Sequence, residues 1–491
     1  MSVDTSKLNL FSFSGKTRIL HLSWIAFFIS FFVWFNHAPL LGMMRESLGL
    51  NDQQIKTLLI LNVALTIPAR IIIGMLVDAF GPRRIYSMLL FVSSFLCFGF
   101  ALAKDFEQLA IMRFLLGFVG AGFVIGIRII GEWFPAKQTG LAQGIYGGWG
   151  NFGSAGAAVI LPTLALAFGG EDGWRYAVGT TGIVALIYSA IYYFSVSDTP
   201  KGSTYFKPKK NGALEITSAF DFFLYLVTNI PLFAALAVLT WKLSPSNLGM
   251  LSEAVTVMIY IILASLYAFQ TIRIYQINKH VFTKSVPEIE RYKFKQVALL
   301  NLSYMVTFGS ELAVISILPL FFMDTFQLSA IQAGLIASVF AGLNLIMRPA
   351  GGWISDKFGR KLSLTLLMLG TGVGYYLLSL VTSEWSLSLA VAVVIFSSLF
   401  VNAGNGAVFA IVPLVKRRMT GQIAGMAGAY GNVGAVTFLT ILSFVATDIF
   451  FMVIAVFAIA VFILIAFFLE DPKDQMAEVL PDGTVQMLDV D

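Results

Sequence analysis

The chain has 491 residues, of which 58% are hydrophobic and only 12% are charged. That composition excludes a soluble globular fold and is typical of a polytopic membrane protein. The single cysteine excludes an internal disulfide and a cysteine-based metal or iron–sulfur centre. With three histidines in the whole chain, the sequence also argues against a haem or redox metal site. The net charge of +5 is informative only when the charged residues are assigned to individual loops.

Apolar stretches of about 20 residues recur almost from end to end, and each is long enough to cross a bilayer as a helix. The first is too long for the apolar core of a removable signal peptide. We therefore expect an all-α polytopic membrane protein in which two groups of six helices flank an inserted hairpin, fourteen predicted transmembrane helices in total. The predicted spans are 19–43, 55–79, 85–104, 108–131, 141–168, 174–197, 218–241, 252–275, 297–323, 329–350, 362–382, 386–412, 421–444 and 447–469.

The same pattern divides the chain into four parts. Residues 1–200 form a predicted N-terminal six-helix bundle, and residues 296–470 form a C-terminal one. Residues 201–295 form a cytoplasmic linker that carries the extra hairpin at 217–275, for which the sequence indicates no role. Residues 471–491 form an acidic cytoplasmic tail that we expect to be mobile.

Loop charge predicts the orientation. Basic residues gather in alternate loops on one side of the membrane, whereas the loops on the other side carry mainly acidic or mixed charge. The positive-inside rule then places both termini in the cytoplasm of a multi-pass protein in the inner or plasma membrane. The basic residues are Arg83, Arg84, Lys137, Lys201, Lys207, Lys209, Lys210, Lys279, Lys284, Arg291, Lys293, Lys295, Lys357, Arg360, Lys361, Lys416, Arg417 and Arg418.

Two arginines occupy matching places within apolar helices of the two halves. Subtracting 70 from 348 and 78 from 356 gives 278 both times, so each arginine belongs to a repeated set. A charged side chain at membrane depth costs at least about 2.5–3.5 kcal/mol on insertion scales and usually marks a substrate path. The repeat therefore predicts one anion held between two halves. The sets are Arg70, Gly74 and Asp78 in the first half and Arg348, Gly352 and Asp356 in the second.

A second repeat pairs TGLAQGIYGGWGNFG (139–153) with TGQIAGMAGAYGNVG (420–434). Its glycines recur at helical spacing, so they share a face that another helix can approach closely, and packing alone would explain them. Asn151 and Asn432 continue that face, and an amide inside a membrane needs hydrogen-bond partners. Asn151 is therefore a candidate to bind substrate directly, and Asn432 is a weaker one. Because both repeats run in the same order, they describe parallel repeats, as in the major facilitator architecture.

The loop motif Gly-x3-Asp-x2-Gly followed by basic residues occurs twice and resembles the hallmark of the major facilitator superfamily. Its glycines allow a tight turn and close helix approach. Its aspartate can accept from backbone N–H groups of a neighbouring helix end or pair with basic side chains across a gate. The alternative is an ordinary positively charged cytoplasmic loop. The residues expected to serve gating are Gly74, Asp78, Arg83, Gly352, Asp356 and Arg360.

The paired GGWGNFG and GAYGNVG segments are similar to the doubled signature of the nitrate/nitrite porter (NarK-like) family within that superfamily. YMVTFG (304–309) and GFVGAGF (117–123) extend the match, which looks closer to cyanobacterial-type nitrate permeases than to respiratory exchangers. The inserted hairpin and the EWFP segment (132–135) depart from the family pattern. The resemblance implies one central substrate site formed by Arg70, Arg348, Asn151, Tyr304, Phe123 and Phe308.

The chemistry of the two arginines agrees with a nitrate site. Nitrate is small, planar and unprotonated at physiological pH, and a planar guanidinium presents forked donors that suit flat oxyanions. Neither Arg70 nor Arg348 has an acidic residue within a helical turn, so an entering anion would relieve their mutual repulsion. The rings of Phe123 and Phe308 could stack on the flat faces of the anion and exclude tetrahedral ions. The alternative is that the arginines hydrogen-bond carbonyls of broken helices.

Two acidic residues within predicted helices bear on energy coupling. Glu311 follows Phe308 by three residues and is the first candidate proton carrier. Glu132 is the second, although Arg128 lies one turn earlier and could neutralise it locally, or could itself line the cavity. The alternative for Glu311 is a carboxyl that hydrogen-bonds a neighbour and takes no part in transport.

We therefore expect a secondary transporter that imports nitrate, and nitrite, by alternating access and by proton symport, with Arg70 and Arg348 clamping the anion. The alternatives are a nitrate/nitrite antiporter, an organic-anion or phosphate exchanger of the same fold, and a nitrate sensor that moves nothing. The chain has no phosphate-loop motif, so we expect neither an enzyme nor an ATP-driven pump. We expect no cofactor, metal or nucleic acid, and a monomer whose partners are nitrate or nitrite, protons and the lipid bilayer.

Overall fold

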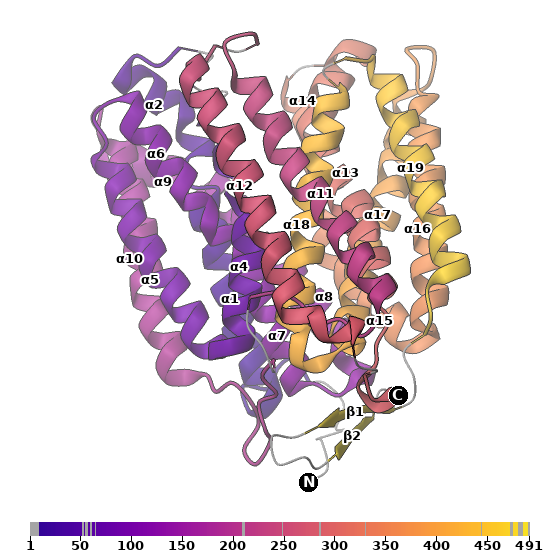
Figure 1. The fold of residues 1–491 in the computed structure, drawn as a ribbon. Coiled ribbons are helices and arrows are strands. Elements are labelled where there is room, and N and C mark those ends of the chain that lie inside the picture. The colour runs from indigo at the N-terminus through magenta and orange to yellow at the C-terminus, as the bar shows by residue number, and fades with distance from the viewer. Residues whose placement is uncertain are drawn as a thin grey trace.

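The computed structural model describes residues 9–489, apart from 52, 53, 55, 56, 59, 60, 64, 209–211, 248, 284, 285, 329, 443, 472–474 and 480–484. Within these residues, thirteen helices are long and apolar enough to cross a membrane. They stand side by side as a helical bundle (Figure 1), so the predicted all-α membrane fold is confirmed. Three basic residues of the predicted loops, Lys209, Lys210 and Lys284, lie outside the described residues.

The first half of the chain forms α1 (Gly15–Trp34), α2 (Leu41–Leu48), α4 (Thr66–Phe80), α5 (Pro82–Leu102), α6 (Phe106–Leu116), α7 (Gly122–Trp133), α8 (Ala136–Asn151), α9 (Gly153–Phe168) and α10 (Gly173–Ser195). A 3-10 turn, Gly117–Ala121, joins α6 to α7, and α8 and α9 form one span interrupted at Phe152. The predicted helices 108–131 and 141–168 are therefore each a single span with a local irregularity.

The second half forms α13 (Phe294–Phe326), α14 (Ala330–Gly342), α15 (Asn344–Phe358), α16 (Arg360–Ser379), α17 (Leu387–Val415), α18 (Thr420–Leu442) and α19 (Thr447–Phe468). The remaining predicted helix, 329–350, is present as α14 and α15, which a turn at Leu343 separates. The first half has its counterpart in a turn at Leu65, just before α4. Both turns lie five residues before the repeated arginine, so the internal repeat extends to the helix breaks.

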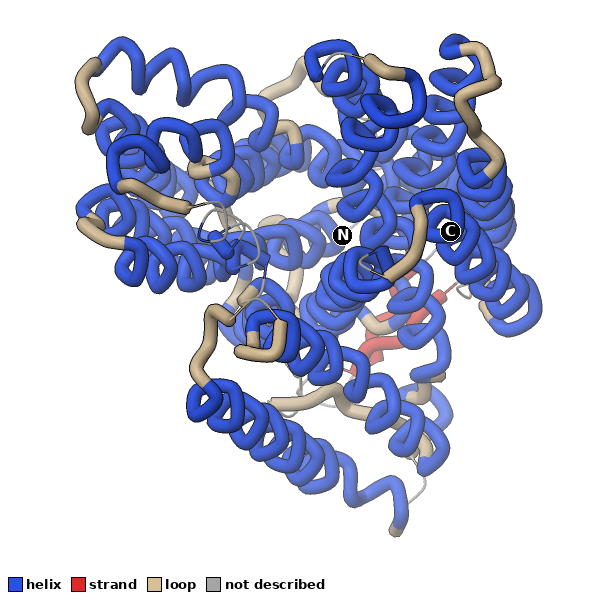
Figure 2. The backbone as a smooth tube through the Cα atoms, turned by 90° about the horizontal axis from the view of Figure 1, so that it is seen from above, coloured by secondary structure: helices blue, strands red, loops and turns tan. Residues whose placement is uncertain are grey.

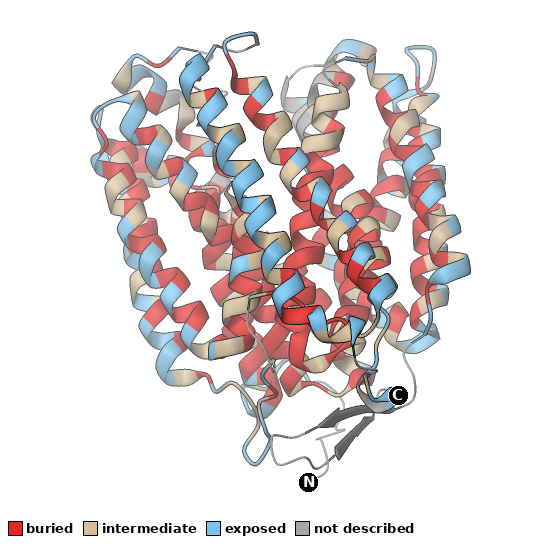
Figure 3. Ribbon diagram, viewed as in Figure 1, coloured by how far each residue is buried: buried red, intermediate tan, exposed pale blue. Residues whose placement is uncertain are grey.

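The inserted hairpin consists of α11 (Ala219–Leu243) and α12 (Glu253–Asn278). Seen from above, it stands at the edge of the bundle (Figure 2). Helix α11 packs on α18 and α13, whereas α12 packs mainly on α11. Most of α12 is accordingly exposed, in contrast to the buried centre of the molecule (Figure 3). An exposed apolar helix at this position is what a lipid-facing segment requires.

Within the described residues, β-strands occur only in the acidic tail. Two strands, β1 (Gln475–Val479) and β2 (Val485–Asp489), pair antiparallel at the end of the molecule where α19 finishes. The sequence at 481–483 is Pro-Asp-Gly, which is typical of the turn between two strands and could have predicted this pairing. The mobility of the tail stays a prediction.

The two repeated motif loops share one backbone geometry. Gly81, between α4 and α5, has a φ of 91°, and Gly359, between α15 and α16, has a φ of 95°. These values lie in the region that favours glycine, so the glycine of each motif is required by the sharp turn between consecutive helices. The turns set the direction in which Asp78 and Asp356, three residues earlier, face the opposite half of the bundle.

Candidate substrate site between the two bundles

Arg70 lies in the middle of the molecule, on the face of α4 that meets α18. Its side chain is 1% exposed. Nη1 donates to the carbonyl of Gly428 at 2.6 Å, and Nε donates to the carbonyl of Gly120, in the 3-10 turn, at 3.4 Å. Arg70 therefore partly follows the structural alternative, because it binds carbonyls where a helix is irregular. Since Gly428 belongs to the second half, the arginine also bridges the two halves.

Arg348 is equally buried, on α15 in the opposite half. Its Nη2 donates to the hydroxyl of Tyr304 at 2.8 Å, and its Nη1 has no hydrogen-bond partner. Among the described residues, no carboxylate lies within 4.0 Å of either Arg348 or Arg70. Two buried guanidinium groups without counter-ions are electrostatically unfavourable, and a small anion between them would compensate their charge.

Three aromatic rings lie between the guanidinium groups. The rings of Phe123 and Tyr304 are parallel within 1° at 6.2 Å, and those of Tyr304 and Phe308 are parallel within 3° at 4.9 Å. The Arg70 guanidinium carbon lies 5.4 Å from the Phe308 ring centre, and that of Arg348 lies 5.0 Å from the Phe123 ring centre. Each arginine thus faces aromatic surface as well as polar atoms, which suits a flat anion.

The glycine repeat has a direct structural reason at this site. A Cβ added to Gly147 would come within 2.7 Å of Arg348 Nε, and one added to Gly428 within 3.1 Å of Arg70 Cδ. Each glycine of one half thus makes room for the arginine of the other half. The spacing of the glycines predicts close packing of helices, and in the structure two of these glycines also leave space for the arginine side chains.

The two asparagines that follow these glycines differ in environment. Asn432, one turn beyond Gly428 on α18, is 1% exposed, and neither atom of its amide has a partner. Asn151, one turn beyond Gly147, is half-buried at the end of α8. The weaker sequence candidate therefore has the stronger structural signature, because a buried unsatisfied amide is costly unless a ligand or water pairs with it.

Glu311 is buried on α13 between two amide groups that the sequence analysis missed. Asn344 Nδ2 donates to Oε1 at 2.8 Å, and Asn405 Nδ2 donates to Oε2 at 2.6 Å. The amide oxygens of both asparagines lack partners. Asn344 comes one turn before Arg348 on α15, and this spacing could have identified it. Asn405, from α17, has no sequence relation to Glu311, and only the packing of α17 on α13 brings them together.

One set of predicted gating residues lies where α15 meets α8. Asp356 accepts from the backbone N–H groups of Gly140, at 3.1 Å, and Leu141, at 2.9 Å. Arg360 pairs with Asp356 at 2.7 Å and donates to the Ala136 carbonyl of the other half at 2.7 Å. A Cβ added to Gly352 would lie 2.0 Å from the Gly140 carbonyl oxygen, so the two backbones touch here.

The other set of predicted gating residues lies where α4 meets α18. Asp78 accepts from the N–H groups of Gly421, at 2.9 Å, and Gln422, at 2.8 Å. It also pairs with the buried Arg128 at 3.3 Å, which in turn pairs with Glu132 at 3.0 Å. Arg128 therefore lies with the predicted gating residue Asp78 and apart from Arg70 and Arg348, and its ion pair with Glu132 is the local one that one alternative expected.

Arg83 differs from the other predicted gating residues. Its Nε donates to the carbonyl of Tyr193 at 2.6 Å, and its backbone N–H donates to Asp198 at 2.8 Å. Both partners belong to the same half of the chain. In this structure Arg83 joins the end of α10 to the motif loop, whereas Arg360 bridges the two halves.

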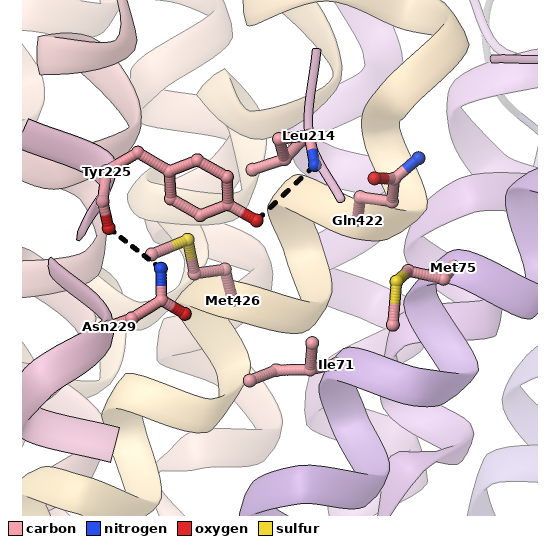
Figure 4. Close-up of a pocket in the computed structure, with 7 residues that line it drawn as sticks. All are labelled: Ile71, Met75, Leu214, Tyr225, Asn229, Gln422 and Met426. Carbon is pink, nitrogen blue, oxygen red and sulfur yellow. Dashed lines mark hydrogen bonds between the residues drawn. The ribbon is translucent and has the colours of Figure 1, made fainter. Parts of the chain in front are cut away.

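A separate small pocket opens between α4, α11 and α18 and the linker (Figure 4). Its lining includes no cationic side chain, so it offers no counter-charge to an anion and we assign the substrate site to the arginines instead. The pocket-lining residues are Ile71, Met75, Leu214, Tyr225, Asn229, Gln422 and Met426.

Comparison with known proteins places this geometry in a class. The sequence profile of the Major Facilitator Superfamily matches residues 23–282 and 300–485. The solved structure of the proton:xylose symporter XylE has the same fold, with a TM-score of 0.60 at 15% identity, over 93% of this chain and 96% of that one. The chain therefore belongs to the major facilitator superfamily, whose members are transporters and not enzymes.

Two relatives narrow the class. The chain is 48% identical to the nitrate/nitrite transporter NrtP of Nostoc punctiforme, over 95% of both chains. It is 47% identical to NrtP of Picosynechococcus, over 97% of both. Within the superfamily the chain thus belongs to the nitrate/nitrite porter family that its motifs resemble, and the cyanobacterial type expected from the sequence is confirmed.

Proposed function

We propose that this protein imports nitrate, and nitrite, as a secondary active transporter. The observation that carries the proposal is the pair of buried arginines, Arg70 and Arg348, one from each half, without a carboxylate partner among the described residues. The two relatives named as nitrate/nitrite transporters support the choice of anion. Guanidinium groups stay charged at any physiological pH and offer forked donors to a planar oxyanion.

The surroundings of the arginines favour a flat monovalent ion. Arg348 Nη1 and the amide of Asn432 are donors without partners, and Tyr304, Phe123 and Phe308 present aromatic surface. We propose that these groups, with Asn151 at the outer end of α8, bind the anion. A tetrahedral ion would not fit against the parallel rings, which argues against a phosphate exchanger.

Alternating access follows from the paired gates. Asp78 and Asp356 each hold the beginning of a helix of the opposite half, so the motif-bearing end of the bundle is closed in this structure. We propose that this end and both termini face the cytoplasm, as the basic loops predict. Rocking of the bundles (residues 1–200 and 296–470) would then break both gates and release the anion inward.

Proton symport is the coupling that we propose, with Glu311 as the carrier and Glu132 as the second candidate. As a carboxylate, Glu311 accepts from the amides of Asn344 and Asn405. After an amide flip, the unpaired oxygen of either asparagine can accept from a protonated carboxyl, so the same pair suits both states. A bound anion and an ionised Glu311 repel each other, which favours joint binding of proton and anion.

The test is uptake of labelled nitrate into proteoliposomes with an imposed pH gradient, compared with nitrite and phosphate. We expect accumulation of nitrate and nitrite that collapses when the gradient is dissipated, and no accumulation of phosphate. Accumulation driven only by internal nitrite would support an antiporter. Binding of nitrate without flux would support a sensor.

A Glu311→Gln variant tests the proton carrier. We expect pH-driven accumulation to fall at least about tenfold, while exchange of internal for external nitrate stays within about threefold of the parent, because the anion site is intact. Glu132→Gln tests the second candidate in the same assay, and the loss of pH-driven accumulation in that variant alone would assign the carrier to Glu132. Unchanged proton dependence in Glu311→Gln would exclude Glu311 as the carrier.

A further inference from the structure

A third buried arginine lies outside the substrate site and both gates. Arg113, on α6, is 0% exposed, and so are Asn36, His37, Cys97 and Thr181 around it. These five residues, here called the Arg113 cluster, come from the end of α1, from α5, from α6 and from α10. Arg113 precedes Phe123 by ten residues along α6 and α7, which places it at least about 15 Å away along the helix axis, on the side opposite the gates.

The hydrogen bonds of Arg113 leave most of its donors unused. Nη1 donates to Asn36 Oδ1 at 3.0 Å and to His37 Nδ1 at 3.0 Å. Nε and Nη2 have no partner. Because the guanidinium can only donate, His37 Nδ1 must be the acceptor, so the imidazole carries its proton on Nε2 and that atom also lacks a partner.

The charge of Arg113 is not compensated by the described protein. No carboxylate of the described residues lies within 4.0 Å of it, and the guanidinium carbon lies 5.6 Å from the centre of the Phe100 ring. Arg128, 15 residues later and equally buried, has both Asp78 and Glu132. Of these two buried arginines, only Arg128 has counter-ions among the described residues.

We propose that the Arg113 cluster binds one small monovalent anion of the size of chloride or nitrate. An ion at the Nε/Nη2 edge would accept hydrogen bonds from the unused N–H groups of Arg113 and would neutralise the charge of its buried guanidinium. One cation with neutral partners suits a single negative charge, and the surrounding asparagine, threonine and cysteine side chains can adapt to either ion. The proposal is independent of the transported substrate, because none of these residues belongs to the arginine pair or to the gates.

The experiment measures the thermal unfolding midpoint of the purified full-length protein at constant ionic strength, with gluconate replaced stepwise by chloride or by nitrate. It uses the double variant Arg70→Gln, Arg348→Gln, which removes the substrate site. We expect chloride or nitrate to raise the midpoint of this variant by about 2–4 °C relative to gluconate. The two ions identify which anion occupies the cluster. A midpoint that is the same in all three salts would overturn the proposal and leave water as the partner of Arg113.

Two further substitutions, each added to the double variant, locate the effect. Arg113→Gln should abolish the anion-dependent rise. Asn36→Asp supplies a built-in carboxylate next to Nη1, so it should raise the midpoint in gluconate and remove the response to chloride and nitrate, even if Arg113→Gln folds poorly. Arg175→Gln is the control, because Arg175 already pairs with Asp172 at 2.6 Å. Retention of the full response in Asn36→Asp would contradict the assignment.

Discussion

The two halves of this chain repeat one plan with different chemistry. Arg70 and Arg348 are related by the repeat, yet Arg70 binds two backbone carbonyls while Arg348 binds a tyrosine hydroxyl and keeps a free nitrogen. Asp78 and Asp356 hold opposite helix starts in the same way, but Asp78 pairs with Arg128 from another helix, whereas Asp356 pairs with Arg360 four residues later in the chain. The repeat fixes positions, and the differences assign separate tasks to each half.

The same contrast appears in the first helix of each half. Gly153 packs on the Phe28 carbonyl and Gly434 packs on the Met305 carbonyl, which aligns α1 with α13 at an offset of 277. On that alignment Trp34 is the counterpart of Glu311. Trp34 donates from its indole to the Asn62 carbonyl, whereas Glu311 accepts from two asparagines. The first half therefore has no carboxyl at the position that corresponds to Glu311, so the two halves differ at the proposed coupling site.

The largest expected effect concerns the arginine pair. Arg70→Ala and Arg348→Ala should each lower kcat/KM for nitrate uptake at least about 100-fold, because each removes charge-assisted hydrogen bonds of about 1.5–3 kcal/mol. Lysine at either position should restore little of the uptake, because an ammonium group lacks the two parallel N–H donors of a guanidinium. Initial uptake rates, normalised to the amount of inserted protein, measure this. Parental uptake in either alanine variant would refute the paired clamp, and a much smaller loss in Arg70→Ala would mean that Arg70 is mainly structural.

Substitutions at the two predicted gates should differ in their effect on the free energy of unfolding. Asp78→Asn should lower the free energy of unfolding by about 3 kcal/mol, because it breaks a buried network with Arg128. Asp356→Asn should lower it by about 1–2 kcal/mol, since Arg360 keeps its bond to the Ala136 carbonyl. Thermal unfolding of the purified variants compares them. Equal losses would show that the Arg128 network adds nothing to the α4–α18 gate.

Tyr304→Phe should have a moderate effect confined to one half. The substitution keeps the stacked ring and removes the hydroxyl that holds Arg348 Nη2. We expect KM for nitrate to rise about fivefold to tenfold, the value of one hydrogen bond of about 1–1.5 kcal/mol, with little change in protein amount. Tyr375→Phe is the control, because its hydroxyl donates to Ser310 and not to an arginine. A KM within twofold of the parent would show that the hydroxyl does not orient Arg348 for binding.

The smallest expected effect lies at the surface. Glu470 accepts from Lys293 at 2.8 Å and pairs with Lys295 at 2.6 Å, and these amines hold the pKa of Glu470 below its ordinary 4.5. Since the folded-state pKa is lowered, the stabilisation is present above pH 4.5 and is lost as the pH falls through the folded value. Glu470→Gln should therefore cost about 0.2–1 kcal/mol at pH 7, and this cost should shrink as the pH falls below 4.5. A cost that does not change with pH would show a packing effect instead.

Sequence reasoning located the elements of the arginine site but not their contacts. The repeat pointed to Arg70, Arg348 and the glycines, because charge at membrane depth and helical spacing are visible in a single sequence. It did not reveal that Arg128 and Glu132 belong to a gate, or that Asn405 binds Glu311. Those contacts join helices far apart in the chain, and no spacing rule connects them. The strand pairing of the tail was missed for a different reason, since its turn signal was overlooked.

The amino-acid sequence by itself determined the membrane fold, the parallel repeat and the matching positions of Arg70 and Arg348. These follow from hydrophobicity, loop charge and periodicity, which act locally along the chain. The tertiary structure decided which buried charges are compensated. Whether Arg70, Arg113, Arg128 or Arg348 has a carboxylate partner depends on which helices pack against it, because a charge in a low-dielectric interior is governed by its neighbours in space.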